Sequence, residues 1–322
     1  MNRWLMFLVL FWLLTGCAEA PQPALRVGVN PWVGYDPLVL AGERRLFDPA
    51  RVRVVELSSN TESKRALRNG LVDGAALTLD EALRLADAGM DLKIIAVLDI
   101  SQGADAVLAR EGIHAPADLK GKTIALEKTA VGALVLDRLL RAGGLSRDDV
   151  RLIHVESAQH GSSLTNGRAD AVITFEPMKS WLVARGFPVI FDSRAMPGEI
   201  VDILVARAGT LESHMAEWVE LLAGWERARR ALLADESAAA QLAPGADLTP
   251  EEYRATLAGL TLSSLKDSVR LLSGPSPELT RAGEGIAETL YRLELIRRPP
   301  DWGALLDARP AARASIAAEE EP

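Results

Sequence analysis

The chain of 322 residues contains a single cysteine, Cys17, near its beginning. Nothing after it can therefore form a disulfide, act as a thiol nucleophile or bind a metal through a thiolate. The four histidines (His114, His154, His160 and His214) do not have the spacing of metal-binding motifs. The sequence accordingly predicts no metal site and no cofactor.

Runs of basic residues are also missing, and the formal net charge is −8. Such a surface does not attract a phosphate backbone, which argues against nucleic-acid binding. An acidity of this size is ordinary, and it does not identify a ligand.

The long hydrophobic run is confined to Trp4–Leu14, which is too short to span a bilayer. Arg3 precedes it and Leu14-Thr15-Gly16-Cys17 follows it. This pattern resembles a bacterial lipoprotein signal, which implies cleavage before Cys17 and lipidation of Cys17. We therefore expect a signal peptide at residues 1–17 and a tether at 18–23. A lone transmembrane helix is the alternative, and the length of the run argues against it.

Apolar segments and polar loops alternate over residues 24–207, as in a sheet whose strands are followed by helices. Residues 92–98 form a continuous apolar run, typical of a strand covered on both faces. We expect residues 99–105 to interrupt the sheet. The predicted strands span residues 27–29, 51–57, 74–77, 92–98, 106–109, 123–126, 151–155, 171–175, 189–191 and 202–207.

The segment after residue 207 has a helical pattern. Trp218 and Trp225 share one stripe of it, which predicts that both indoles belong to the core. Residues 308–322 are rich in Ala, Glu and Pro, a composition that predicts a disordered tail. About 300 residues follow the signal, more than one compact core usually holds, which favours two lobes.

The stretch Arg26–Pro37 carries an indole, a phenol and a carboxylate (Trp32, Tyr35 and Asp36) between a predicted strand and a predicted helix. Loops of this kind line the ligand crevice of open α/β sheets. The alternative is that the two aromatic residues only cover the end of the sheet.

Four segments together resemble a known family in their order and spacing. They are Val27-Gly28-Val29-Asn30-Pro31-Trp32, Leu67–Ala75, Asp118–Ala125 and Gly167–Pro177. They are similar to bacterial substrate-binding proteins of ABC importers, in the group for nitrate, sulfonates, taurine and thiamine precursors. The resemblance implies an α/β, two-lobed periplasmic-binding-protein type II fold with a cleft between the lobes and a C-terminal helical segment.

The same resemblance implies where the chain divides. Residues 24–103 and 199–307 would form lobe I, and residues 104–198 lobe II, with hinges near 99–105 and 198–202. The loops at the strand ends then give the predicted ligand-binding residues, namely Trp32, Tyr35, Asp36, Ser59, Asn60, Thr78, Asp80, Gln102, Glu127, Thr129, Gln159, Glu176 and Asp202.

These loops indicate two different ligand chemistries. Carboxylates beside aromatic rings are suited to a cationic nitrogen. Glu176, which follows a strand directly, is the strongest single candidate for such a contact, although it could instead cap a helix. This chemistry predicts a cationic or zwitterionic ligand. The alternative is a small anion such as nitrate or an alkanesulfonate, bound at helix N-termini near Ser59 and Thr129.

An enzyme is the competing class, because the fold includes a cysteine- and histidine-rich enzyme of thiamine-pyrimidine synthesis. The composition does not provide those residues. Ser263-Ser264-Leu265-Lys266 matches the Ser-x-x-Lys pattern of acyl-enzyme hydrolases but lacks the partner motifs of that class. We therefore expect a monomeric, non-enzymatic lipoprotein that faces the periplasm. It would deliver a solute to an ABC permease and ATPase, or report it to a membrane sensor.

Overall fold

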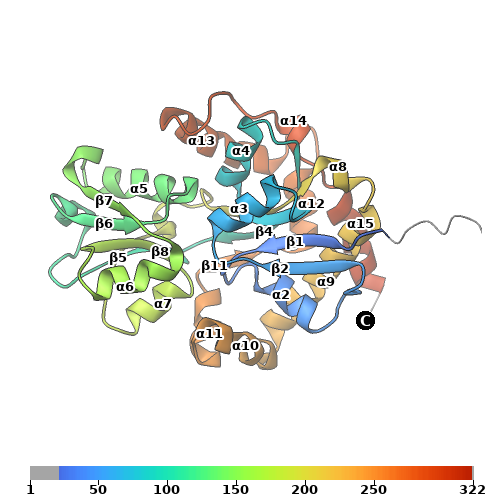
Figure 1. Ribbon diagram of the computed structural model, residues 1–322, viewed down its shortest axis with the longest axis horizontal. Helices are drawn as coiled ribbons and strands as arrows, with labels where there is room; N and C mark the ends of the chain where they lie inside the picture. The colour runs from blue at the N-terminus through green and yellow to red at the C-terminus, as the bar shows by residue number, and fades with distance from the viewer. Residues whose placement is uncertain (1–21, 321–322) are drawn as a thin grey trace, which may run out of the picture.

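The structure is a computed structural model, and it describes residues 22–320. The predicted signal peptide, the lipidation site Cys17 and most of the tether lie outside the described residues. The described chain forms two sheets (Figure 1). No helix of the described part is long and apolar enough to cross a membrane.

The first sheet has the strand order β11-β4-β10-β3-β1-β2. Strand β1 runs parallel to β2 and β3, whereas β10 is antiparallel to β3 and β4. Its strands are β1 (Leu25–Val29), β2 (Val52–Glu56), β3 (Gly74–Thr78), β4 (Leu92–Ser101), β10 (Val201–Arg207) and β11 (Leu260–Leu262).

The second sheet has the order β7-β6-β8-β5-β9. Its strands are β5 (Asp105–Ala109), β6 (Thr123–Leu126), β7 (Arg151–His154), β8 (Ala171–Phe175) and β9 (Val189–Asp192). The chain crosses between the sheets twice, from β4 to β5 and from β9 to β10. Strand β10 therefore returns to the first sheet, as the sequence predicted.

Helices cover both faces of each sheet, which explains why inner strands such as β3 and β5 are buried along their whole length, whereas the edge strands β2 and β7 carry exposed charged residues. In β5, Val107 packs with helix α5 (Ala130–Ala142), while Leu108 packs on the opposite side with α6 (His160–Thr165) and α7 (Met178–Val183). Figure 1 shows α5 on one side of the second sheet and α6 and α7 on the other.

Around the first sheet lie the remaining helices. They are α2 (Asp36–Glu43), α3 (Asn60–Arg68), α4 (Leu79–Asp87), α8 (Ala208–Leu211), α9 (Met215–Ala234), α10 (Glu236–Leu242), α11 (Pro250–Leu257), α12 (Leu265–Leu272), α13 (Glu278–Arg292), α14 (Trp302–Leu305) and α15 (Arg309–Glu320). In α9, Trp218 and Trp225 are fully buried, which confirms the prediction that they belong to the core.

Three predictions about the chain are wrong. Strand β4 continues through Ser101 instead of stopping at residue 98, because β10 and β11 pair with it on either side. Strand β11 lies in a segment that we expected to be helical throughout. The predicted disordered tail is helix α15, whose Ala311, Ala314 and Ala318 are buried in the core of the first sheet.

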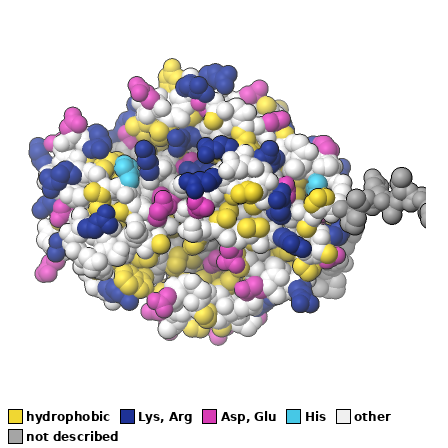
Figure 2. Space-filling view, in the orientation of Figure 1, with side chains coloured by type: hydrophobic (Ala, Val, Ile, Leu, Met, Phe, Trp, Pro, Cys, Tyr) yellow, Lys and Arg dark blue, Asp and Glu magenta, His cyan; other side chains and the backbone are white. Residues whose placement is uncertain are grey.

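The face of the molecule in Figure 2 carries charged side chains of both signs with hydrophobic side chains among them. Lys and Arg gather over α3 and α4, beside hydrophobic side chains towards α5 and β7.

Candidate functional site

A small cavity of about 40 Å³ lies between the two sheets. Segments from both sides form its wall: the loop after β1, the first turn of α3 and the end of β3 on one side, and β5, β8 and the start of α5 on the other. Its lining residues are Asn30, Trp32, Tyr35, Asn60, Thr78, Asp105, Glu127, Val131, Phe175, Ile200 and Asp202. Several lie at the carboxyl ends of strands, where open α/β sheets bind ligands.

Trp32 is held in the cavity wall by two contacts. Its indole Nε1 donates to Asp99 Oδ2 at 3.1 Å, and its ring meets Phe175 edge to face, with the centroids 5.9 Å apart. Because Asp99 belongs to the first sheet and Phe175 to the second, this indole connects the two sides of the cavity.

Gly34 allows the indole to approach Asp99. A Cβ atom at this position would lie 2.0 Å from Asp99 Oδ2 and 2.3 Å from Trp32 Nε1. We expect Gly34→Ala to break this contact and to destabilise the protein by roughly 1–3 kcal/mol, as overpacking does. Circular dichroism melts of Gly34→Ala and Gly209→Ala test this, because no atom lies within 4 Å of a Cβ at Gly209. Equal melting temperatures would contradict it.

Acidic side chains gather where β4, β10 and β3 meet. Asp202 lies opposite Asp99 on one neighbouring strand and opposite Thr78 on the other. The Tyr35 hydroxyl donates to Asp202 Oδ1. Asp105 is the first residue of β5, and its backbone N–H donates a hydrogen bond to Ser101 Oγ at 3.1 Å.

Burial raises the pKa values of these carboxyl groups. It raises the pKa of Asp99 to about 8 and the pKa values of Asp80 and Asp105 to about 7. Burial, together with the charge of Asp99, also raises the pKa of Asp202 well above its usual range. At neutral pH several of these groups therefore carry a proton, which can be donated in a hydrogen bond.

Some buried oxygen atoms in the cavity wall have no partner. Asn30 Oδ1, Asn60 Oδ1 and Asp105 Oδ2 accept no hydrogen bond from any residue between 22 and 320. The three side chains are 7 or 8% exposed. Leaving such groups unpaired costs about 1–3 kcal/mol each, which a bound ligand or water can recover.

The structure brings six of the predicted site residues into this cavity. They are Trp32, Tyr35, Asn60, Thr78, Glu127 and Asp202. A seventh, Asp36, lies in an adjoining hollow of about 220 Å³, which shares Asn30 and Trp32 with the cavity. Asp36 accepts a hydrogen bond from the Tyr253 hydroxyl, and burial raises its pKa to about 7.

The other predicted residues do not line the cavity. Ser59 caps α3 by accepting the Glu62 N–H, and Thr129 caps α5 by accepting the Gly132 N–H. Gln102 and Gln159 are exposed on the surface. Asp80 is buried in the first turn of α4.

Glu176 also lies outside the cavity lining. Its two carboxylate oxygens accept hydrogen bonds from Ser180 N and Ser180 Oγ, both at 3.0 Å, and Lys179 forms an ion pair with it at 3.2 Å. These partners occupy the carboxylate, so Glu176 secures the start of α7. Glu176 therefore acts as a helix cap, which was the alternative to ligand contact in the sequence analysis.

Sequence reasoning missed Asn30, Asp105, Val131, Phe175 and Ile200 as lining residues. Asp105 could have been found because it begins a strand at a predicted crossing, and Phe175 because it ends a predicted strand. Val131 and Ile200 carry no polar signal that would have identified them.

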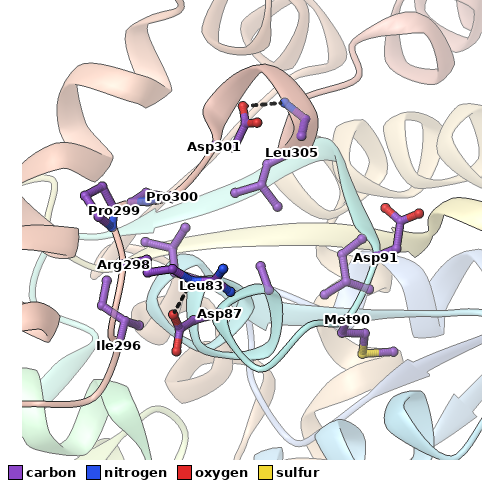
Figure 3. A pocket seen from close by; sticks show the side chains of 13 residues that line it. Leu83, Asp87, Met90, Asp91, Ile296, Arg298, Pro299, Pro300, Asp301 and Leu305 are labelled. Carbon is purple, nitrogen blue, oxygen red and sulfur yellow. Dashed lines mark hydrogen bonds and ion pairs between the residues drawn. The ribbon is translucent and has the colours of Figure 1, made fainter.

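A larger cavity of about 290 Å³ lies away from the two-sheet site, between α4 and residues 296–305. Two polar groups of this cavity are paired: Asp87 faces Arg298, and Asp301 accepts the N–H of Ala304 (Figure 3). One side of the first sheet provides all of its walls. It therefore lacks the two-sided construction of the small cavity.

The residues described contain no group of three or more His, Cys, Asp or Glu side chains arranged to hold a metal ion. Of the acidic side chains between the sheets, Asp99 accepts from Trp32 and Asp202 accepts from Tyr35.

The chain belongs to the NMT1-like family, whose model matches residues 18–244. A protein of Escherichia coli (strain K12), named for binding aliphatic sulfonates, is 27% identical over 175 residues. That match covers 52% of this chain and 54% of the relative, so the likeness spans about half the length of the curated protein.

Solved structures share the fold. The alkanesulfonate-binding protein of Xanthomonas axonopodis pv. citri, solved with MOPS, is 22% identical with a TM-score of 0.73, covering 90% of this chain and 100% of that one. The periplasmic nitrate-binding protein of Synechocystis PCC 6803 is 15% identical with a TM-score of 0.72, covering 94% and 92%. These matches confirm the predicted two-lobed periplasmic-binding-protein fold.

A desulfurization enzyme has the same fold, with a TM-score of 0.66 and 14% identity over 91% of this chain and 99% of that one. The fold alone therefore does not separate binding from catalysis. The chemistry of the site has to distinguish a binding protein from an enzyme.

Proposed function

We propose that the protein is the extracytoplasmic solute-binding component of an ABC importer. The observation that carries this proposal is a cavity whose polar wall is shared between two sheets joined by only two crossings. Such a cavity can open and close as the two parts move. The family and the named relatives support the same function.

The small size of the cavity supports movement of the two parts. A volume of about 40 Å³ is far below the roughly 300–1,000 Å³ of a usual small-molecule site. Contacts across the cavity hold it shut: Thr61 Oγ1 donates to Glu127 at 3.0 Å, and Ala130 N donates to Glu81 at 2.6 Å. The solute would enter when residues 104–198 move away from the rest, with the bends near 99–105 and 198–202.

The solute that we propose is a small oxyanion such as an alkanesulfonate or nitrate. The relatives named above bind anions, and this favours the alternative over the cationic ligand that the carboxylates first suggested. Asn60 opens α3, whose N-terminal N–H groups and dipole attract negative charge. Protonated carboxyl groups of Asp105 and Asp202 would add donors instead of repelling the anion.

A zwitterion with an ammonium group is the second candidate, and a specific observation favours it. None of the residues that line the cavity is Lys or Arg, and Asn30 and Asp105 present unpaired acceptor oxygens there. An ammonium group would satisfy these oxygens, while a sulfonate on the same molecule could face the start of α3.

A thermal-shift screen separates these candidates. The protein from Ala18 onward would be melted with methanesulfonate, nitrate, sulfate, amino-sulfonates and simple amines, because a ligand that binds the native state raises the melting temperature. A shift with methanesulfonate or nitrate supports the oxyanion proposal. A shift confined to amino-sulfonates favours the zwitterion, and shifts with simple amines alone would overturn the oxyanion proposal.

We also propose that Cys17 carries a lipid that holds the protein at a membrane, with its body facing the periplasm. The basis is the pattern Leu14-Thr15-Gly16-Cys17 after a short apolar run. In cells expressing the full chain, Cys17→Ala should move most of the protein from the membrane fraction to the soluble fraction, detected by immunoblot. Cys17→Ala protein that stays in the membrane fraction would contradict lipidation.

The partner would be a permease with its ATPase, or a membrane sensor that reads the closed form. Deleting the neighbouring permease genes separates the two. Loss of uptake of the solute supports import, whereas intact uptake with loss of a transcriptional response supports sensing.

A further inference from the structure

A further hollow lies next to the cavity between the sheets and shares Glu127 with it. It is a groove of about 550 Å³ between α5, β6 and β7 on one side and the end of α13 on the other. Its apolar wall is formed mainly by leucine side chains, including Leu126, Leu136, Leu140, Leu152, Leu293 and Leu295, while charged residues such as Glu127 and Asp137 also line it. We call it the leucine groove.

The leucine groove joins a basic hollow of about 440 Å³, because Arg84, Lys128 and Leu295 line both. The basic hollow carries six cationic side chains: Lys64, Arg65, Arg68, Arg84, Lys128 and Arg297. Its acidic lining consists of Glu81 and Asp87. Figure 2 shows basic side chains over α3 and α4 with hydrophobic side chains beside them, towards α5.

The two carboxylates do not neutralise the basic hollow. Glu81 pairs with Lys64 at 2.8 Å, and Asp87 pairs with Arg297 at 3.1 Å. Within the described chain, no carboxylate lies within 4 Å of the charged groups of Arg68 and Lys128. The hollow therefore keeps a positive potential that favours an anion.

The leucine groove has the properties of a small-molecule site. Its volume lies in the usual range of about 300–1,000 Å³, and apolar side chains dominate its wall. Leu136 and Leu140 stand one turn apart on α5, and their side chains form part of the apolar wall. An apolar chain placed here would be removed from water, while its end at Lys128 would meet the cations.

We propose that the joined hollows bind an amphiphile with an anionic head group, one molecule at a time. The apolar chain occupies the leucine groove, and the head group contacts Lys128 and Arg68 in the basic hollow. Glu127 lines both the leucine groove and the solute cavity, but the side chains that would hold the amphiphile lie outside that cavity, so the proposal does not depend on which solute is bound.

Titration calorimetry with n-decyl phosphate, kept below its aggregation concentration, tests the proposal. The protein would begin at Ala18, since every described helix and strand follows that residue. We expect one molecule bound per chain, with an affinity at least tenfold higher than that of inorganic phosphate or n-decyltrimethylammonium. Equal affinities for decyl phosphate and inorganic phosphate would overturn the role of the leucine groove. Equal affinities for the two decyl compounds would overturn the role of the cations.

Variants locate the site. The exposed pair Arg68→Glu and Lys128→Glu should weaken decyl phosphate at least tenfold, and Leu293→Gln should weaken it without affecting inorganic phosphate. Arg281→Glu, an exposed cation outside both hollows, serves as the matched control and should change nothing. Melting curves would confirm that each variant is folded.

Two further outcomes would overturn the proposal. Loss of decyl phosphate binding in Trp32→Phe, with no loss in the groove variants, would place the molecule in the solute cavity. Binding to phosphatidylglycerol vesicles without binding of monomeric decyl phosphate would make the basic hollow a membrane-contacting surface instead.

Discussion

At pH 8 the protein is expected to melt at least about 5 °C below its melting temperature at pH 5, since roughly 2–4 °C corresponds to 1 kcal/mol in domains of 150–250 residues. The cause lies in the buried acids between the sheets. Burial raises the pKa of Asp99 to about 8 and the pKa of Asp105 to about 7, whereas an unfolded aspartate titrates near 3.9.

The sign follows from the protons bound in each state. Between about pH 4 and pH 8 the native protein keeps protons on these carboxyl groups that the unfolded chain has released. Stability therefore falls as the pH rises through this window. Below about pH 4 stability falls again, because acids whose pKa is lowered by ion pairs in the native protein become protonated. For Asp137, burial acts against ionisation, but its bonds to Arg292 still lower its pKa. We thus expect the greatest stability near pH 4–5.

Two substitutions test the source of this dependence. Asp99→Asn and Asp202→Asn keep an oxygen that can accept from Trp32 and Tyr35 but cannot ionise. The double variant should raise the melting temperature at pH 8 and reduce the difference between pH 5 and pH 8 by at least half. Glu284→Gln, at an exposed position, is the control and should leave the difference unchanged. A melting temperature that rises from pH 5 to pH 8 would contradict the assignment.

The pH dependence also bears on the proposed solute. An oxyanion should bind more weakly at pH 8.5 than at pH 6, because ionised carboxylates in the cavity wall would repel it. A zwitterion that places its ammonium group beside Asp105 should show a smaller decrease or none. Calorimetry at the two pH values therefore distinguishes the two candidates.

Local pattern predicted most of the sheets because each strand ends in a distinctive polar loop. The stretch Arg26–Pro37 shows this well: β1 ends at Val29, and Trp32 and Tyr35 follow in the loop that lines the cavity. The tryptophans of α9 were equally clear from helical spacing. In these segments the periodicity of apolar residues agrees with their burial.

The errors in the fold arise from long-range contacts. Asp99 resembled a loop residue because an acid inside a strand is costly, yet Trp32 donates to it from 67 positions away. Strand β11 has three residues and exists through its pairing with β4. Neither interaction leaves a local pattern.

Within the site, the sequence identified the loops but did not show which polar residues line the cavity and which cap a helix. Ser59 and Asn60 are neighbours in one loop, yet Ser59 caps its own helix and Asn60 lines the cavity. Glu176 and Phe175 differ in the same way. Adjacent side chains point in different directions at the end of a strand, and only the three-dimensional arrangement shows which one lines the cavity.

Helix α15 leads to the second large expected effect: Ala314→Glu should destabilise the protein by at least about 3 kcal/mol. Ala311, Ala314 and Ala318 are at most 1% exposed, and they share a core with Trp218 and Trp225 of α9. The Ala314→Glu substitution would place a larger side chain and an unpaired charge in this core. Both changes are costly.

Ile316→Glu provides the matched control, because Ile316 lies on the same helix and is 62% exposed. It should change stability by less than about 0.5 kcal/mol, as is usual for surface positions. Urea unfolding followed by tryptophan fluorescence measures both variants. If α15 is part of the core, the midpoint falls for Ala314→Glu alone. Similar midpoints for the two variants would show that the helix contributes little, and that the disorder predicted from its Ala- and Glu-rich composition describes this segment better.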